Sequence, residues 1–591
     1  MIKIGNLNID KKDIVCTSIL LLIFLVSSVI VCFKVNTMIL RVWLILITTY
    51  ILGFAGCIYH FGISNIFREI RDHKLKYIFL LIVILFLLRT LKFELADVKK
   101  LSTTGKVIIS FNLVFFPAIL IAISRFLRKD YSLEKVFVIF GSILGIMFML
   151  ILPTGTVPDE VYHAKATYTV SNMLMGIHSN EESEILVREN DAIFFNNDAY
   201  RKAYLTRDDF EHYIHSYTES AGKTNLVGIR FYGKNVYSPA YFIPAIGLTF
   251  GRLIGLNTAF TFLLARLFNL LFYIGIGYFA IKLLPFGKKA AVGLFLMPMA
   301  IHQAMSLSYD VFVNITALFI IAATLHLAFQ EEERKRFIVL SIFITIFALI
   351  LFNIKSHAYF LVSFFPLLVL ALKKISLSVQ QMSILKKIVF VGIVLFIVGF
   401  FALYFTHFFQ NLPYNPTYIT LSGSIPKTES YSVSYFITHP TSLFRLFLST
   451  FRVMWKWYIV SFIGGYLGWL DFMVPSWTTS IYLFLLIVLS LKRIEEEKIL
   501  QRKYKISFMG VSVLTVLFII FGMAISWTVL TSPIVEGVQG RYFIPIAPLV
   551  LMCIPSNYIM VDQKYDKYII SVMAIITLYT VCLLYTSPSP R

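Results

Sequence analysis

The stretch DVFVNITALFIIAATLHLAF (310–329) decides the fold class of this chain. After Asp310 it contains no charged residue, and its 20 residues would form a helix about 30 Å long, which is the thickness of a bilayer's hydrocarbon core. A soluble helix of this length would carry a polar face toward water. The stretch therefore predicts a membrane-spanning helix.

Similar apolar runs occur along the whole sequence and predict further spans. Only helices and closed barrels satisfy all backbone groups in lipid, and these runs are too long and too uniform for barrel strands. We therefore expect an all-α integral membrane protein, a polytopic helical bundle. The other expected spans are about 14–33, 39–59, 77–95, 106–125, 134–153, 258–284, 288–306, 337–353, 357–373, 388–407, 476–491, 505–527, 542–560 and 567–585.

Composition agrees with a membrane protein. Of 591 residues, 58% are hydrophobic and 14% are charged, whereas a soluble domain has about 45–50% and about 25%. The formal charge of +21 would also suit a nucleic-acid-binding protein. Most basic residues, however, lie in short loops between apolar runs, as expected from membrane topology, so no nucleic-acid partner is predicted. The five cysteines form neither a disulfide framework nor a zinc-binding cluster.

The basic loops predict the orientation, because cytoplasmic loops are enriched in Lys and Arg. With the N-terminus in the cytoplasm and the first span retained, nearly all basic loops fall on the cytoplasmic side. The exception is the loop with Lys92, Lys99, Lys100 and Lys106. Those on the expected side contain Arg68, Arg71, Lys74, Lys76, Arg125, Arg128, Lys129, Lys288, Lys289, Arg334, Lys335, Arg336, Lys373, Lys374, Lys386, Lys387, Lys492, Arg493, Arg502, Lys503 and Lys505.

Two long segments then lie outside the cell, at 154–257 and 408–475. Within the first, 237–255 is apolar but is interrupted by two prolines, so we expect an interfacial or re-entrant segment rather than a span. Within the second, PTSLFRLFLSTFRVMWKWYIV (440–460) mixes basic and aromatic residues, as amphipathic helices at a membrane surface do.

The first candidate for chemistry is TGTVPDEVYHAKA (154–166), just after a span. If a helix starts here, His163 lies one turn from both Asp159 and Glu160. That spacing suits a carboxylate–imidazole pair for proton transfer or a pair of metal ligands. A simple cap on a helix beside the membrane explains the same residues and is favoured by spacing alone. Paired acids at a membrane exit raise the case for function.

The second candidate is the outside loop EGVQGRYF (536–543). Arg541 suits a phosphate, which a guanidinium binds through two parallel charged hydrogen bonds. Gln539 and Tyr542 flank it as possible substrate-lining residues. An Arg–Tyr anchor at the interface is an equally good interpretation.

Other candidates also lie near the outer interface. Lys355 would neutralise a leaving phosphate, although snorkelling of a long side chain is the simpler explanation. Asp310 either lines a substrate site or caps its helix. Trp469 and Asp471, in the turn IGGYLGWLD, would line a sugar site or merely pack.

In this order, PDE-x-x-H (158–163), ARLFN (265–269), Asp310, IGGYLGWLD (463–471) and GVQGRYFIPIAPL (537–549) resemble the bacterial domain-of-unknown-function 2142 membrane family. That family is grouped with the GT-C superfamily of membrane glycosyltransferases. The resemblance covers about 134–561 and implies a GT-C-like bundle with a large first outside loop. It leaves 1–133 as extra spans and 562–591 as a last span with a Ser/Pro tail unlike the rest.

By this resemblance, an acid of the first outside loop is the catalytic base, with Asp159 preferred over Glu160. The implied reaction takes a sugar from a polyprenyl-phosphate donor, with inversion, onto an envelope glycan or lipid-linked acceptor at the bacterial plasma membrane. Arg541 and Lys355 would bind the donor phosphate. No cofactor or metal is expected, although a divalent ion is compatible.

Two other classes remain open from the residues. A transporter or flippase for lipid-linked glycans often shows paired halves and charges deep within spans. Here the charges cluster outside, and no paired halves are found, which disfavours this class. A polysaccharide polymerase or ligase is chemically closer, since it also uses large outside loops. An ATP-driven pump is not expected, because the sequence lacks a phosphate-binding loop motif.

Overall fold

The computed structural model describes part of the chain. The described residues are 2–4, 7–9, 118–120, 122–127, 130–179, 183–196, 216, 225–231, 238–378, 431–496 and 500–586. The spans expected at 14–33, 39–59, 77–95 and 388–407, and most of the span expected at 106–125, lie outside these residues.

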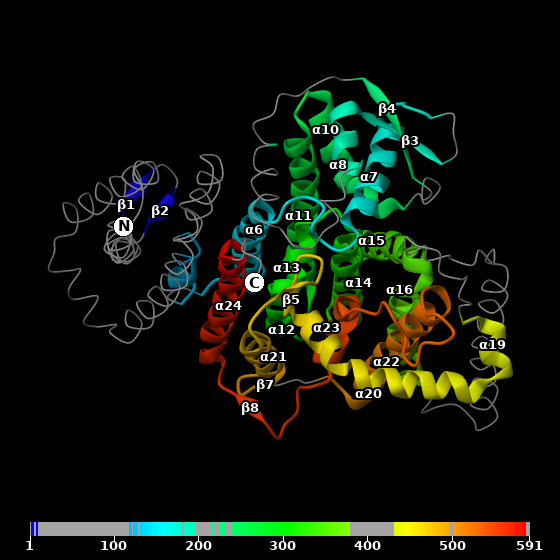
Figure 1. The fold of residues 1–591 in the computed structure, drawn as a ribbon. Helices are drawn as coiled ribbons and strands as arrows, with labels where there is room; N and C mark the ends of the chain where they lie inside the picture. Colours follow the sequence, from blue (N-terminus) through cyan, green and yellow to red (C-terminus); the bar gives the residue numbers. More distant parts are fainter. Residues whose placement is uncertain are drawn as a thin grey trace.

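The described part is a helical bundle, which confirms the all-α polytopic fold (Figure 1). Within it, six helices are long and apolar enough to cross a membrane. The central one is α14, whose apolar window is 89% buried, whereas α15 on the edge is 17% buried. The six are α6 (Leu133–Ile151), α11 (Thr258–Leu283), α14 (Asp310–Phe329), α15 (Arg334–Phe352), α22 (Arg502–Ser526) and 563–584, which contains most of α24 (Asp566–Thr586).

Three of the expected spans are not continuous helices. The stretch 288–306 forms α12 (Lys288–Phe295) and α13 (Pro298–Ala304), and the chain breaks where Pro298 opens the second helix. The stretch 357–373 is divided between α16 (Phe360–Ser363) and α17 (Phe365–Ser378).

The third expected span that is not a continuous helix is 542–560, and its prediction as a span is wrong. It begins inside a 3-10 helix, η4 (Gly540–Ile546), continues as α23 (Ala547–Leu551), and then leaves helical structure. Prolines at 545 and 548 explain this, because each removes a backbone N–H that a longer helix would need. The expected span 476–491 is the 15-residue α21 (Ser476–Ser490), which is short for a complete crossing.

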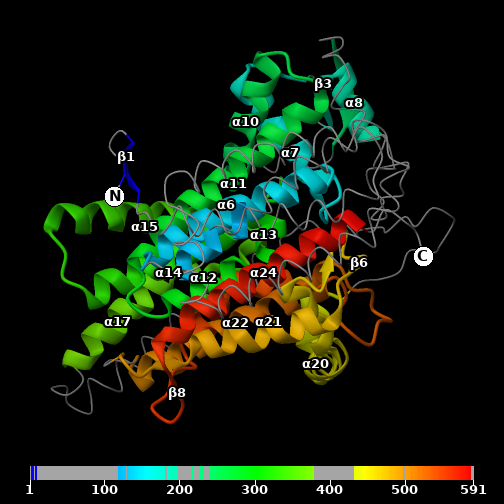
Figure 2. The same cartoon turned by 90° about the vertical axis from the view of Figure 1, so that its left-hand side faces the viewer.

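A mixed module stands at one end of the bundle, and we call it the end module (Figures 1 and 2). It runs from α7 to α10, and its α10 packs antiparallel to the first half of α11, with Gly247 against Ala265 and Gly251 against Thr261. With 12 residues, about 18 Å, α10 is too short to span. The elements are α7 (Glu160–Leu174), β3 (Glu184–Arg188), α8 (Glu189–Asn196), β4 (Leu226–Arg230), η2 (Pro239–Tyr241) and α10 (Phe242–Leu253); β3 and β4 pair antiparallel.

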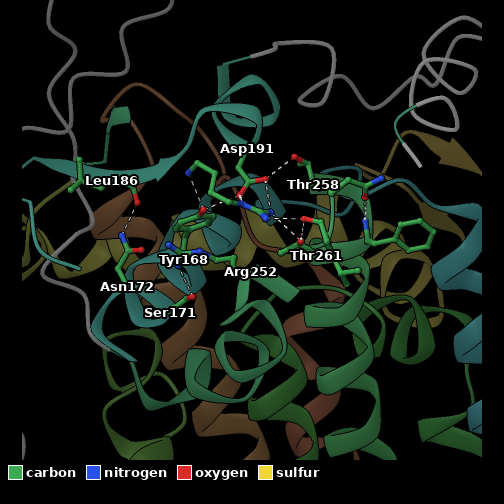
Figure 3. Close-up of polar contacts among 12 residues, drawn as sticks. Tyr168, Ser171, Asn172, Leu186, Asp191, Arg252, Thr258 and Thr261 are labelled. Carbon is green, nitrogen blue, oxygen red and sulfur yellow. Dashed lines mark hydrogen bonds and ion pairs between the residues drawn. The ribbon is translucent and has the colours of Figure 1, made fainter. Parts of the chain in front are cut away.

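A buried polar network joins the end module to α11 (Figure 3). Asp191 accepts from Arg188 Nε at 2.7 Å, from Tyr168 Oη at 2.8 Å and from Thr258 Oγ1 at 2.6 Å. Arg188 also donates to Thr261 Oγ1 at 3.0 Å. These contacts link α7, α8 and α11, and so they fix the module on the first turn of the span.

One long helix crosses the others. Figure 1 shows α20 (Pro440–Ile463) along its length, and Figure 2, turned by 90°, shows it nearly end-on beside the lengthwise α21, α22 and α24. It follows α19 (Val433–Thr438) and leads into the hairpin of β5 (Tyr466–Leu467) and β6 (Phe472–Met473). The crossing direction agrees with an interfacial helix rather than a span.

The opposite end of the bundle carries basic loops. Lys289 contacts Glu496 at 3.0 Å and Asp566 at 3.1 Å, and buried Arg493 contacts Asp566 at 2.6 Å. These ion pairs gather the starts of α12 and α24 and the end of α21. Near them, β7 (Lys492–Arg493) pairs in parallel with β8 (Met560–Val561), η5 (Gln563–Tyr565) follows, and β1 (Ile2–Ile4) pairs with β2 (Leu7–Ile9) elsewhere.

Candidate functional site

A polar cavity of about 320 Å³ lies where the end module meets the bundle. It is built from segments far apart in the sequence: the start of α7, the start of α14, the turn before α16, the end of α22 and η4. Its lining residues are Asp159, Tyr162, His163, Tyr309, Asp310, Lys355, Trp527, Arg541 and Tyr542.

Asp159 presents its carboxylate to this cavity. It precedes α7 in a left-handed conformation, with φ +62°, which is a strained geometry for a residue other than glycine. Its side chain makes no capping hydrogen bond, is 52% exposed, and accepts instead from Arg541 Nη2 at 3.3 Å. The geometry thus does not support the simple cap interpretation.

Glu160, the next residue, has a different environment. It is fully buried, and Arg266, also fully buried, donates to its two oxygens at 2.8 and 2.5 Å. The backbone N–H groups of Gly155 and Leu307 donate to it as well, at 2.8 and 3.0 Å. Arg266 further donates to the Leu152 carbonyl, so the pair joins α11 to the end of α6. Glu160 is not among the cavity-lining residues and acts as a positioning group.

His163 lines the cavity but has neutral partners. Its Nδ1 is 2.7 Å from Tyr241 Oη, and its Nε2 is 3.3 Å from Ser308 Oγ. Burial lowers the pKa of His163 to about 4, against the opposing effect of Asp310 and Asp159. At neutral pH the ring is therefore uncharged. It positions the start of α7 against the loop before α14.

We expect the stability of the protein to fall on acidification because of His163. Its folded pKa lies below the unfolded value of 6.5, so the unfolded chain takes up this proton first as pH falls. Stability from this group is complete above pH 6.5 and is lost between pH 6.5 and about 4, by roughly 3 kcal/mol. Thermal unfolding of the detergent-solubilised protein measures it. His163→Gln should flatten the decline, whereas exposed His439→Gln should leave it unchanged.

Asp310 connects the two cations of the cavity. Its carboxylate lies 2.6 Å from Lys355 Nζ and 3.6 Å from Arg541 Nη1. It is the first residue of α14, and its own N–H donates to Ser308 Oγ. Asp310 therefore lines the cavity and holds Lys355 and Arg541 on one wall. Lys355 does not snorkel, since its Nζ lies over the Tyr542 ring at 3.9 Å.

Four described residues other than glycine have a positive φ, and two of them, Asp159 and Lys355, line this cavity. His357 lies two residues after Lys355, and the fourth, Leu470, lies in the β5–β6 turn. Besides Asp159, Lys355 and His357 have positive φ values of +51° and +66°. Two contacts stabilise the turn that contains Lys355 and His357. His357 Nδ1 lies 2.6 Å from the Phe352 carbonyl, and Tyr359 Oη donates to the Tyr542 carbonyl at 2.9 Å. Strain of about 1–3 kcal/mol per residue persists only where surrounding contacts impose it, and such residues cluster at functional sites.

Arg541 is placed by the close approach of η4 to α20. A Cβ on Gly540 would overlap the backbone of Tyr458 and Phe462 in α20, and Gly540 N donates to Ser461 Oγ at 2.9 Å. The Arg541 side chain is 2% exposed. Such burial does not fit the alternative of an interfacial Arg–Tyr anchor, which keeps its polar end in water.

We expect Gly540→Ala to displace Arg541 and to reduce stability. The overlap is with backbone atoms, which do not give way as a flexible side chain does, so the loss should be about 1–3 kcal/mol or more. Gly522→Ala is the matched control. No atom lies within 4 Å of its added Cβ, so it should be neutral or slightly stabilising in the α22 helix. Thermal unfolding of both variants measures the difference, and equal midpoints would contradict this account of Gly540.

Comparison with known proteins identifies the family. Residues 142–550, well over half of the chain, match the sequence profile of the family described as predicted membrane protein (DUF2142). The chain is a DUF2142 protein. Neither the curated proteins nor the solved structures contained a match to it. Within this DUF2142 protein the matched region includes every cavity-lining residue.

Not all predicted site residues of this DUF2142 protein meet in the cavity. Asp159, His163, Asp310, Lys355, Arg541 and Tyr542 do. Gln539 precedes η4 with a buried Oε1 that has no partner among the described residues. Trp469 and Asp471 lie in the β5–β6 turn and are not lining residues. Burial raises the pKa of Asp471.

Sequence reasoning missed Tyr162, Tyr309, Trp527 and Arg266 as site residues. The three aromatics carry no signal of their own among 16% aromatic residues. Arg266 did carry a sequence signal, because an arginine within the apolar run 258–284 is costly unless it is paired. Among the described residues, no group of three or more His, Cys, Asp and Glu side chains could hold a metal ion. The spacing of Asp159 and His163 would allow two metal ligands, but among the described residues no third such ligand joins them.

Proposed function

We propose that this protein is a glycosyltransferase that takes a sugar from a polyprenyl-phosphate donor and transfers it to an envelope glycan or lipid-linked acceptor. The supporting observation is an accessible carboxylate, Asp159, facing a wall that carries Arg541 and Lys355. The family resemblance to GT-C enzymes supports the same reaction, by analogy of site rather than of measured activity.

The residues suit the proposed chemistry. Asp159 accepts the proton of the acceptor hydroxyl as its oxygen bonds to the anomeric carbon and the bond to the donor phosphate breaks. A single displacement of this kind inverts the anomeric centre. Arg541 and Lys355 compensate the charge that develops on the leaving phosphate, as preorganised cations do in a buried site.

We place the cavity on the extracytoplasmic face of a bacterial plasma membrane. Strand β8, which pairs with β7 (Lys492–Arg493), lies at the end of the bundle opposite the end module (Figure 2). Basic loops mark the cytoplasmic side. A donor with a polyprenyl tail stays in the bilayer, which accounts for a polar cavity at the junction between spans and end module.

Reconstitution of the full chain in liposomes tests the function. With a radiolabelled polyprenyl-phosphate sugar and cell-envelope acceptors, we expect a new glycosidic bond and release of polyprenyl phosphate. Movement of the labelled lipid between leaflets with no new bond would overturn the proposal in favour of a flippase. A ladder of products would instead indicate a polymerase.

A further inference from the structure

The crossing helix α20 has an outer surface that no other described element covers. Its buried side includes Leu446, Thr450 and Ser461. On the opposite side an apolar stripe recurs every three or four residues, which is the period of one helix face. The stripe consists of Phe444, Leu448, Phe451, Trp455 and Ile459, with exposed fractions from 37% to 70%.

Basic residues border this stripe on one edge. Arg445, Arg452 and Lys456 each follow a stripe residue and so lie about 100° further round the helix. All three are exposed, and α20 contains no acidic residue. No ion pair joins them to any side chain in the described part of the chain, and Lys456 Nζ lies 5.5 Å from the Trp455 ring centre.

We propose that α20 lies in the membrane surface and binds the anionic phospholipid headgroups of that leaflet through Arg445, Arg452 and Lys456. An apolar stripe with a basic edge is the arrangement by which a surface helix enters the boundary between headgroups and acyl chains. Figures 1 and 2 show α20 crossing the direction of the spans at the site end of the bundle. A helix that lies in a bilayer surface takes this direction.

The inner side of α20 connects the lipid-binding surface to the cavity. The segment before Arg541 runs along the helix through four hydrogen bonds. Ser449 Oγ donates to the Pro533 carbonyl, Val535 N to Thr450 Oγ1, Trp457 Nε1 to the Val538 carbonyl and Gly540 N to Ser461 Oγ, at 2.5, 2.8, 3.2 and 2.9 Å. Lipid bound on the outer side thus fixes the support on which Arg541 rests. The lipid binding itself does not depend on the proposed glycosyl transfer.

Photo-crosslinking tests the proposal with the full chain in nanodiscs. The probes are a photoreactive phosphatidylglycerol and the matching phosphatidylcholine, and mass spectrometry measures labelling of α20 peptides. Each basic residue near an anionic surface contributes about fivefold in affinity. We therefore expect α20 to be labelled at least about fivefold more by the anionic probe.

The triple variant Arg445→Gln, Arg452→Gln, Lys456→Gln should reduce this preference toward one. The matched control removes three exposed charges at the other end of the bundle, with Arg334→Gln, Lys335→Gln and Arg502→Gln, and should leave α20 labelling unchanged. Equal labelling of the wild-type helix by both lipids would overturn the proposal, and this comparison needs no variant to fold. Displacement of the label by equimolar polyprenyl phosphate would also overturn it, in favour of the donor lipid.

Discussion

Asp159→Asn should lower the rate of sugar transfer by about 10²–10⁴-fold while the protein stays folded and inserted. Asparagine retains the size of the side chain and, like aspartate, tolerates the left-handed backbone at this position. It does not accept a proton from the acceptor hydroxyl. Loss of the contact with Arg541 should cost at most about 1 kcal/mol, because the carboxylate is half exposed.

Turnover in the liposome assay and thermal unfolding separate the two effects. Asp130→Asn is the matched control, because Asp130 is an exposed carboxylate paired with Lys567 rather than with a cavity residue. It should keep full turnover. Near-normal transfer by the Asp159→Asn protein would refute the assignment of Asp159 as the base.

Glu160→Gln should act on stability instead. The change leaves the buried guanidinium of Arg266 without a counter-charge, and breaking a buried pair from one side costs about 3–5 kcal/mol. We expect a large drop in the thermal midpoint and in the amount of inserted protein. Any fall in transfer should follow the fraction of folded protein.

A double-mutant cycle with Arg266→Met sharpens this test. The two side chains form one network, so their losses should not add. The double variant should lose clearly less stability than the sum of the two single losses. A Glu160→Gln protein that is as stable as wild type but inactive would assign the chemistry to Glu160 instead.

Together these variants distinguish adjacent acids that the sequence treats alike. Asp159 and Glu160 are consecutive, both follow Pro158, and both lie one turn from His163 in a helical projection. The structure separates them because α7 begins at Glu160 and Asp159 turns out of the helix. One carboxylate therefore points to the cavity, and the other points into the core against α11.

The membrane class, all six described helices that are long enough to span a bilayer, and six of the nine cavity-lining residues could be predicted from the sequence. Hydrophobic length is a local property, so 258–284 and 310–329 were predicted within one residue of α11 and α14. Ionisable residues beside apolar runs are costly unless used, which is why Asp159, Asp310 and Arg541 were detectable without a structure.

The partners of the charged residues and the breaks within apolar runs depend instead on how the chain packs. Whether 288–306 and 542–560 cross the membrane depends on where prolines meet neighbouring helices, and apolarity alone does not reveal it. The pairing of Glu160 with Arg266 joins residues 106 positions apart, and that of Arg541 with Asp159 joins residues 382 apart. Such contacts depend on how the helices pack, and a charge in a sequence does not specify the opposite charge that will reach it.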